Sequence, residues 1–250
     1  MALSKERLIQ ALLAFSPQFQ PLPLEMPSLW RESALIRERE WRCAVREMAR
    51  QPGVLFDMGG GAPYQGYISA EDVGPRTRYF CLDISPEAHP HVVADVTRLP
   101  LASSSVDHIL CNAVLEHVRD PQQAIEEMHR VLRRPGQILV SVPFIYPYHD
   151  RVDYYRFTDT ALRHLFRQFD QLEVVPVGDY LYTTLLFLTG FNFTLVKWLS
   201  PGLSIIRFLL RSAILLYNRL SRAPKRRDLL RSLDKSPVGW YVYGRKLETK

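Results

Sequence analysis

The sequence has 250 residues, of which 47% are hydrophobic, and this favours one α/β domain with an elaboration over two full domains. The formal net charge of +6 at pH 7 is localised, because six basic residues and one acidic residue between Arg219 and Arg231 supply five of those charges. The three cysteines lack metal or disulfide spacing and the N-terminus lacks a secretory signal, so we expect reduced thiols, no metal site and a cytoplasmic protein.

Elements of secondary structure can be predicted in chain order from the spacing of apolar residues. Residues 1–51 have helical spacing and predict two helices that flank the main domain. From Pro52 short β-rich runs alternate with helical ones, which predicts a mostly parallel sheet with helices on both faces. The predicted helices of this part are 121–133, after Asp120, and 158–169. The predicted strands are Val54–Asp57, Tyr79–Asp83, His91–Asp95, Val106–Asn112, Gln137–Val142, Leu172–Val177 and Gly239–Gly244.

An apolar insert of about sixty residues separates the sixth predicted strand from the last. It opens with the charge-free run Tyr180–Val196 and continues through the amphipathic stretch Leu203–Leu220 to the basic cluster. This composition is typical of a segment lying in the plane of an anionic membrane, and we expect residues 180–231 to bind the inner face of a membrane peripherally. The run 180–196 is short for a spanning helix and favours a re-entrant or interfacial hairpin. The alternative is an apolar substrate lid or a dimer interface.

The predicted organisation has four regions: N-terminal helices at 1–51, a core at 52–178, the apolar and basic insert at 179–237, and the last core strand at 238–250.

A glycine cluster follows the first predicted strand. Gly59, Gly60 and Gly61 come directly after the buried run that ends at Asp57, an arrangement in which a ligand can approach backbone at the edge of a sheet. An ordinary strand-to-helix turn would have a similar sequence. A dinucleotide fingerprint would place its third glycine at Tyr64, so nicotinamide and flavin dinucleotides are disfavoured.

Two further aspartates end the next two predicted strands. A carboxylate accepts hydrogen bonds only, so Asp83 can bind two ribose hydroxyls and Asp95 can bind an adenine amino group. Each aspartate alone is more often a turn or cap residue. Together with Asp57, their order along the chain favours an adenosyl methyl donor.

Residues 54–143 resemble the methyltransferase type 11 group of class I S-adenosylmethionine-dependent methyltransferases. The matching segments are 57–61, Asp83, Asp95-Val96, 99–101 with 106–107, 112–118 and 132–137. The resemblance implies a Rossmann-like seven-stranded, mostly parallel sheet with a reversed final hairpin, and S-adenosylmethionine as the donor. The donor-binding residues that it implies are Asp57, Gly59, Gly60, Gly61, Asp83, Asp95, Val96 and Asn112. Pro63 departs from the pattern, where many members have glycine, and this puts the local loop geometry in doubt.

The acceptor side is predicted in the loop after the fifth strand. A hydroxyl acceptor must lose its proton during methyl transfer, so a basic side chain is needed near it. We expect His149 to be this base, oriented by Asp150 or Asp153. The alternative is that His149 is a surface histidine. His117, just after the fourth strand, is the second candidate base.

Other residues of that loop are expected to bind the acceptor: Tyr146, Tyr154 and Arg156. The loop resembles that of type 11 members from bacterial glycan and cell-envelope pathways. His108 lies within a predicted strand and is expected to be structural.

The sequence therefore predicts a methyltransferase acting on a small molecule, a lipid or a lipid-linked glycan at a membrane surface. One alternative is a non-catalytic, membrane-tethered interaction module with the same fold. The other is an RNA methyltransferase, suggested by the positive charge, but the charge lies beside the apolar insert and no appended RNA-binding motif is found. The oligomeric state is not predicted.

Overall fold

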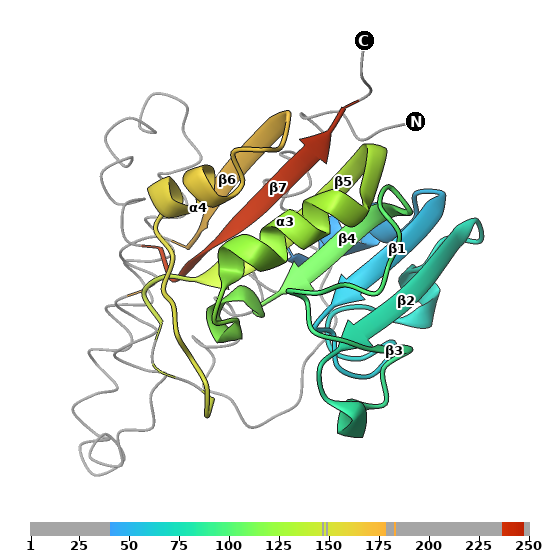
Figure 1. Cartoon of the computed structure of the whole chain (residues 1–250), viewed down its shortest axis with the longest axis horizontal. Coiled ribbons are helices and arrows are strands. Elements are labelled where there is room, and N and C mark those ends of the chain that lie inside the picture. The colour runs from blue at the N-terminus through green and yellow to red at the C-terminus, as the bar shows by residue number, and fades with distance from the viewer. Residues whose placement is uncertain (1–40, 147, 149, 179–182, 184–236, 248–250) are drawn as a thin grey trace, which may run out of the picture. The chain divides into compact units, whose positions relative to one another are not determined.

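Seven strands form one sheet in the computed structural model of the chain (Figure 1). The structure describes residues 41–146, 148, 150–178, 183 and 237–247. The chain divides into two compact units, one of 1–16, 38–175 and 239–250 and the other of 17–37 and 176–238. The sheet lies in the first unit apart from the end of its sixth strand.

The strand order is β3-β2-β1-β4-β5-β7-β6, with β7 antiparallel to β5 and parallel pairing among β1 to β5. The chain runs outward from β1 to β2 and β3, then resumes on the other side of β1 with β4. Such a reversal leaves a crevice at the carboxyl ends of the strands, where ligands bind in open α/β sheets. The strands are β1 Gly53–Met58, β2 Thr77–Asp83, β3 Val92–Val93, β4 Val106–Asn112, β5 Leu132–Pro143, β6 Gln171–Val177 and β7 Gly239–Lys246.

The predicted strands are all present. β4 has the predicted bounds, β1, β2, β6 and β7 are one or two residues longer than predicted, and β3 and β5 differ most in length. β3 has only two residues. At its start His91 directs its ring at the neighbouring strand, where Nδ1 accepts the Cys81 N–H at 3.0 Å, and beyond its end Asp95 lies in a turn, with its carbonyl accepting the Arg98 N–H at 3.0 Å. β5 begins five residues earlier than predicted, since Leu132 is buried and pairs with Val106 of β4. The helix before β5 consequently ends at Val131 rather than at Arg133.

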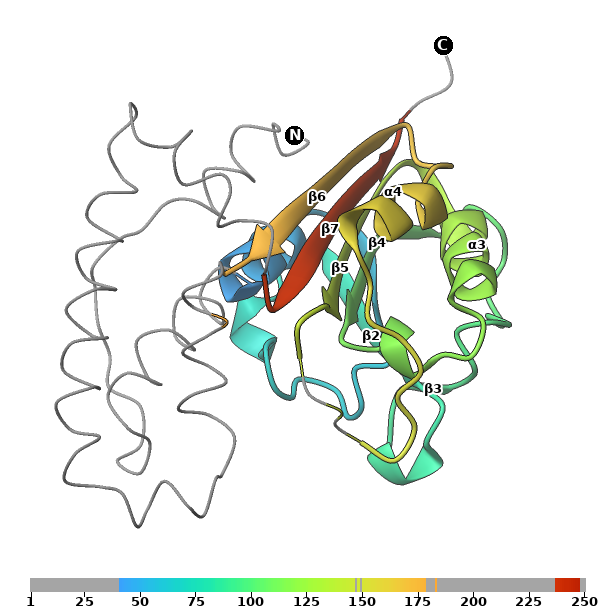
Figure 2. The same ribbon diagram turned by 90° about the vertical axis from the view of Figure 1, so that its left-hand side faces the viewer.

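Helices cover both faces of the sheet, as predicted. The α-helices α3 and α4 lie on one face and the helical residues 41–49 lie on the other (Figure 2). Asp120 caps α3 by accepting the Gln123 N–H at 3.0 Å, and Thr158 caps α4 by accepting the Ala161 N–H at 3.2 Å. The helices and short 3-10 turns are α3 Pro121–Val131, α4 Asp159–Leu165, η1 Ala70–Asp72, η2 Pro86–Ala88 and η3 Leu115–His117.

The segment between β1 and β2 contains turns and η1 but no α-helix, although all of its residues are described. The glycine loop therefore does not lead directly into a helix, and Tyr64, just after Pro63, has a φ of 59°.

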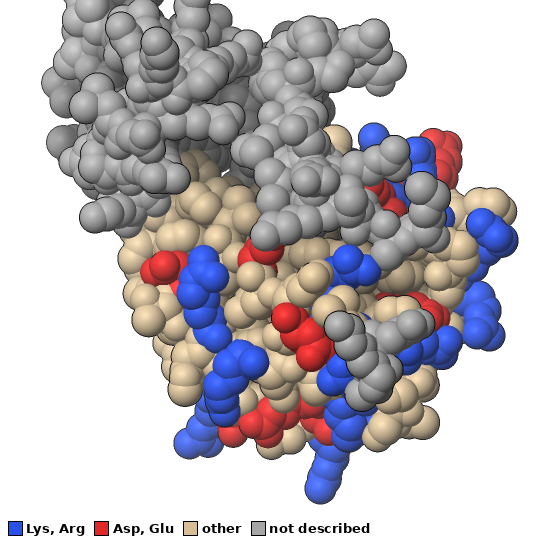
Figure 3. Space-filling model, turned by 90° about the horizontal axis from the view of Figure 1, so that it is seen from above, with Lys and Arg blue, Asp and Glu red and all other residues tan. Residues whose placement is uncertain are grey.

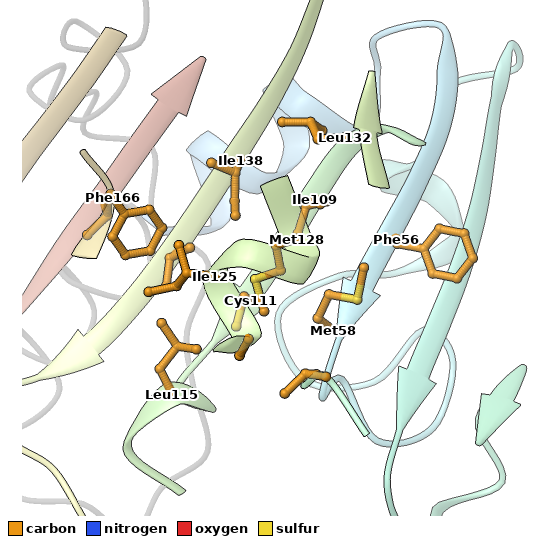
Figure 4. Packing of buried hydrophobic residues seen from close by; sticks show 14 of the residues in the cluster. Phe56, Met58, Ile109, Cys111, Leu115, Ile125, Met128, Leu132, Ile138 and Phe166 are labelled. Atoms are coloured by element: carbon orange, nitrogen blue, oxygen red, sulfur yellow. The ribbon is translucent and has the colours of Figure 1, made fainter. Parts of the chain in front are cut away.

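Alternate side chains of the strands point to the two faces of the sheet. Phe56 and Met58 of β1 pack with Ile109 and Cys111 of β4 beneath Met128 of α3 (Figure 4). The intervening residue of β1, Asp57, is directed to the opposite face. The same alternation that builds the core therefore places a carboxylate beneath the glycine loop.

No helix among the described residues is long and apolar enough to cross a membrane. The predicted membrane-binding residues 180–231 lie outside the described residues apart from Thr183, and so do the predicted N-terminal helices up to residue 40.

We expect Met128→Ala to reduce the free energy of unfolding by about 2–5 kcal/mol, because Met128 is fully buried between α3 and the sheet. Urea denaturation measures the change. Gln123→Ala, on the exposed side of the same helix, is the control and should stay within about 0.5 kcal/mol of the parent. Equal losses in the two variants would contradict the assigned core.

Candidate functional site

Close contacts leave no room for a side chain at two residues of the glycine loop, Gly59 and Gly60. Gly59 has a φ of 73°, and a Cβ built on it would lie 2.5 Å from the Val114 side chain. A Cβ on Gly60 would lie 2.5 Å from the carboxylate of Asp57. The backbone of this loop is thus packed against β1 and against Val114, which follows β4, whereas a Cβ built on Gly61 would meet no atom within 4 Å and leaves that side open to a ligand.

Asp57 lies beneath the loop and not at its surface. Its side chain is 1% exposed and accepts hydrogen bonds from the hydroxyls of Tyr67 and Tyr79. Burial raises the pKa of Asp57 to about 6, although both tyrosine hydroxyls oppose the shift. Asp57 therefore supports Gly60 from below, within a hydrogen-bonded group that includes two tyrosines absent from the sequence prediction.

Asp83 ends β2 beside the loop. Its Oδ2 accepts the Gly61 N–H at 2.9 Å and its Oδ1 accepts the Ser85 N–H at 2.9 Å. The next residue, Ile84, is 68% exposed although it is large and apolar. A carboxylate with an apolar side chain beside it suits a ligand with hydroxyls and a flat ring, such as a nucleoside.

Asp95 lies near Asp83 in the sheet, because Ala94 N–H donates to the Asp83 carbonyl at 2.9 Å. The Asp95 side chain is exposed, and its Oδ1 accepts both the N–H and the hydroxyl of Thr97 at 2.8 Å. Val96 is buried in the core and presents no side chain to this edge. The edge thus carries Asp83 at the end of β2 and Asp95 two residues beyond the end of β3.

Asn112 is the last residue of β4, and its Oδ1 accepts the Ser141 hydroxyl at 2.5 Å. It joins the carboxyl ends of β4 and β5 next to the glycine loop. The residues predicted to bind the donor therefore line one edge of the sheet, except that Asp57 and Val96 lie below it.

The predicted acceptor loop is docked on η3. Tyr154 N–H donates to the Glu116 carbonyl at 2.7 Å, and the Tyr155 hydroxyl donates to the Arg119 carbonyl at 2.8 Å. His117 Nδ1 lies 2.5 Å from the Val152 carbonyl oxygen. These bonds hold the loop at the carboxyl edge of β4, close to Asn112.

Of the predicted catalytic residues, His117 and Asp153 are described and His149 lies outside the described residues. The Asp153 carboxylate is buried and binds Arg156 in a bidentate pair, with distances of 2.5 and 2.6 Å. Arg156 also donates from Nε to the Tyr146 carbonyl at 3.0 Å. Asp153 and Arg156 thus brace the loop, whereas Asp150 is exposed and accepts the N–H of Arg151.

Glu116 was not among the predicted residues. Its side chain is 0% exposed, and burial raises its pKa to about 7. In the sequence it is marked only by its place before a candidate histidine, which gives no sign of its burial. His108, expected to be structural, is buried, and its Nε2 lies 3.2 Å from the Pro52 carbonyl. No cluster suited to a metal ion occurs among the described residues.

Residues 56–140 match the family described as "Methyltransferase domain". This region belongs to a class I S-adenosylmethionine-dependent methyltransferase domain. The matched range runs from β1 through β5 and includes every predicted donor-binding residue.

Matches between this methyltransferase domain and curated relatives cover only part of this chain and only part of each relative. A "Probable S-adenosylmethionine-dependent methyltransferase" of Mycolicibacterium smegmatis is 32% identical over 144 residues, 51% of this chain and 53% of its own. An "Arsenite methyltransferase" of Halobacterium salinarum is 28% identical over 109 residues, 37% of this chain and 28% of its own. The chain thus matches about half or less of the length of these relatives.

Solved methyltransferase structures share the fold at low identity. A didemethyltoxoflavin N-methyltransferase of Burkholderia thailandensis is 16% identical, with a TM-score of 0.50, over 88% of this chain and 82% of that one. A SAM dependent methyltransferase of Archaeoglobus fulgidus is 12% identical, with a TM-score of 0.51, over 87% and 97%. The likeness confirms the predicted Rossmann-like sheet.

We expect Asp57→Asn to flatten the pH dependence of stability. The folded protein binds the Asp57 proton more tightly than the unfolded chain does, so this stability is present below about pH 4 and is lost as the pH rises through about 6. The shift corresponds to about 3 kcal/mol. Urea denaturation between pH 4 and 7.5 measures it, and Asp120→Asn, which keeps the α3 cap, is the control. A parent-like slope in Asp57→Asn would contradict the raised pKa.

Proposed function

We propose that this chain is an S-adenosylmethionine-dependent methyltransferase. The observation that carries the proposal is the hydrogen bonding of the glycine loop to Asp83. The two carboxylate oxygens of Asp83 accept backbone N–H groups, and they lie at the edge of the sheet where the strand order reverses. The donor has ribose hydroxyls and an adenine ring but no phosphate. A strand-ending carboxylate, an exposed apolar neighbour and an open loop of glycines fit those groups.

The donor-binding roles follow from these positions. Asp83 would accept the ribose hydroxyls, Gly59 to Gly61 would contact the donor through backbone, and Asp95 would lie toward the adenine. Asn112 lies where the methionine end would meet the acceptor side. When bound, the donor supplies an electrophilic methyl group, and the protein's main contribution is to hold the acceptor in line with it and away from water.

We infer further that the acceptor is a small molecule, a lipid or a lipid-linked glycan. Four apolar or aromatic side chains of the acceptor loop are exposed, namely Tyr148, Val152, Tyr154 and Tyr155. The apolar and basic composition of residues 180–231 supports an acceptor at the cytoplasmic surface of an anionic membrane.

Acidic and basic side chains are interspersed over the described part of the face shown in Figure 3. A nucleic-acid partner would favour a continuous basic surface, so this face gives no support to an RNA acceptor.

The donor site is tested by calorimetric titration of S-adenosylhomocysteine into the full-length chain. We expect Asp83→Ala to weaken binding about 10- to 100-fold, because hydrogen bonds to a charged group contribute about 1.5–3 kcal/mol. Glu87→Gln, an exposed acid four residues away on η2, is the control and should bind like the parent. A folded parent that does not bind would favour the non-catalytic module.

Association with a membrane is tested by sedimentation with vesicles. We expect the chain to sediment with phosphatidylglycerol vesicles at low salt and much less with phosphatidylcholine vesicles, because the basic cluster is attracted to anionic lipid. If the chain stays in the supernatant with both kinds of vesicle, the membrane proposal is contradicted. The proposed donor site is not affected by that result.

A further inference from the structure

The orientation of the His117 ring fixes which nitrogen carries its hydrogen. Nδ1 lies 2.5 Å from the Val152 carbonyl oxygen. A carbonyl oxygen can only accept, so Nδ1 must donate and the hydrogen of the neutral ring lies there. The lone pair of the neutral ring is therefore on Nε2.

Nε2 of His117 is turned toward a buried carboxylate. It lies 3.9 Å from Oε1 of Glu116, whose side chain is fully buried, while the His117 side chain is 25% exposed. The histidine is thus partly exposed to solvent, whereas the glutamate is not. A proton taken up at Nε2 would form an imidazolium beside an anionic carboxylate in a medium of low dielectric constant.

Other charged groups surround this pair. Glu116 experiences attraction from Arg156 and repulsion from Asp153, both on the acceptor loop, and Cys111 of β4 lies near enough to sense its charge. Arg156 and Asp153 largely compensate each other through their bidentate pair. Burial is therefore the main influence on the pKa of Glu116 and raises it. Attraction to His117 acts in the opposite direction and lowers that pKa.

The main chain keeps the pair in place. The Glu116 carbonyl accepts the Tyr154 N–H at 2.7 Å and the Tyr155 N–H at 3.3 Å, so the acceptor loop and η3 form one hydrogen-bonded unit. Figure 2 shows the loop after β5 passing beside η3 below the ends of the strands. The pair thus follows the carboxyl end of β4 and is bound to the loop that carries the exposed tyrosines.

We propose that Glu116 and His117 form a proton-accepting pair for the acceptor, with Nε2 of His117 taking the proton and the Glu116 carboxylate stabilising the imidazolium. This rests on the proposed methyltransferase function. An acceptor hydroxyl forms its new bond to the methyl carbon, the electron pair of the broken carbon–sulfur bond passes to sulfur, and the hydroxyl proton passes to Nε2. The pair suits acceptors that release a proton on methylation, alcohols and phenols above all, and not soft nucleophiles that arrive already ionised.

The test needs no acceptor, because it follows the protons of the pair by NMR in the full-length chain. With ¹⁵N-labelled histidine, we expect His117 to be the Nδ1–H tautomer in the parent and in Glu116→Gln. With ¹³C-labelled glutamate carboxyls, we expect Glu116 to titrate near pH 7 in the parent and at a higher pH, by about half a unit or more, in His117→Asn. The asparagine amide can still donate to the Val152 carbonyl, so the loop should stay docked.

His164→Gln, on the exposed side of α4, is the control and should leave the Glu116 titration unchanged. An Nε2–H tautomer of His117 would overturn the proposal. So would an unchanged Glu116 titration in a His117→Asn variant whose denaturation curve shows that it is folded. Binding of S-adenosylhomocysteine by the parent is measured in parallel. If the parent does not bind it, the methyltransferase function is contradicted. If the parent binds it but the NMR results differ from those expected, only the proton-accepting pair is contradicted.

Discussion

The hydrogen bond from Gly61 to Asp83 connects the loop of one strand to the end of the next, and the donor edge depends on it. Parallel pairing of β1 with β2 brings the ends of both strands to one side. The loop then has to pass over Asp57, a carboxylate held in the sheet by two tyrosine hydroxyls. Gly60 is the residue that allows this close passage, since any side chain would collide with Asp57. The shape of the edge thus follows from the packing beneath it.

A second constraint acts on the acceptor side. The loop after β5 is held to η3 and the residue Arg119 by backbone groups of Val152, Tyr154 and Tyr155 and by the Tyr155 hydroxyl. In enzymes of one fold, a shared half of the site commonly binds one reactant and a variable half binds the other. Tyr154 is bound here through its backbone N–H, so its exposed side chain can change without loss of that bond, whereas a change of Tyr155 would remove one.

The fold could be predicted from the sequence because its signals are local. The alternation of apolar residues in β1 and β4, and the caps at Asp120 and Thr158, each act within a few residues. The strand-ending acid Asp83 could be found for the same reason. Glu116 could not be separated from an ordinary polar residue, because its burial depends on the acceptor loop, which follows it by more than thirty residues in the chain. Likewise, the hydrogen bonds of Tyr67 and Tyr79 to Asp57, and that of His91 at the start of β3, join residues ten or more positions apart in the chain.

The sixth and seventh strands are neighbours in the sheet, and the residues that flank the connection between them are hydrogen-bonded to each other. Val238 N–H donates to the Val177 carbonyl at 3.0 Å, so the chain leaves the sheet and returns to it at adjacent points. Closing a loop between two adjacent points costs little more when the loop is long than when it is short. A short turn joining these two valines would meet the same geometric requirement. The order of the parallel strands therefore does not depend on the length of the connection between β6 and β7.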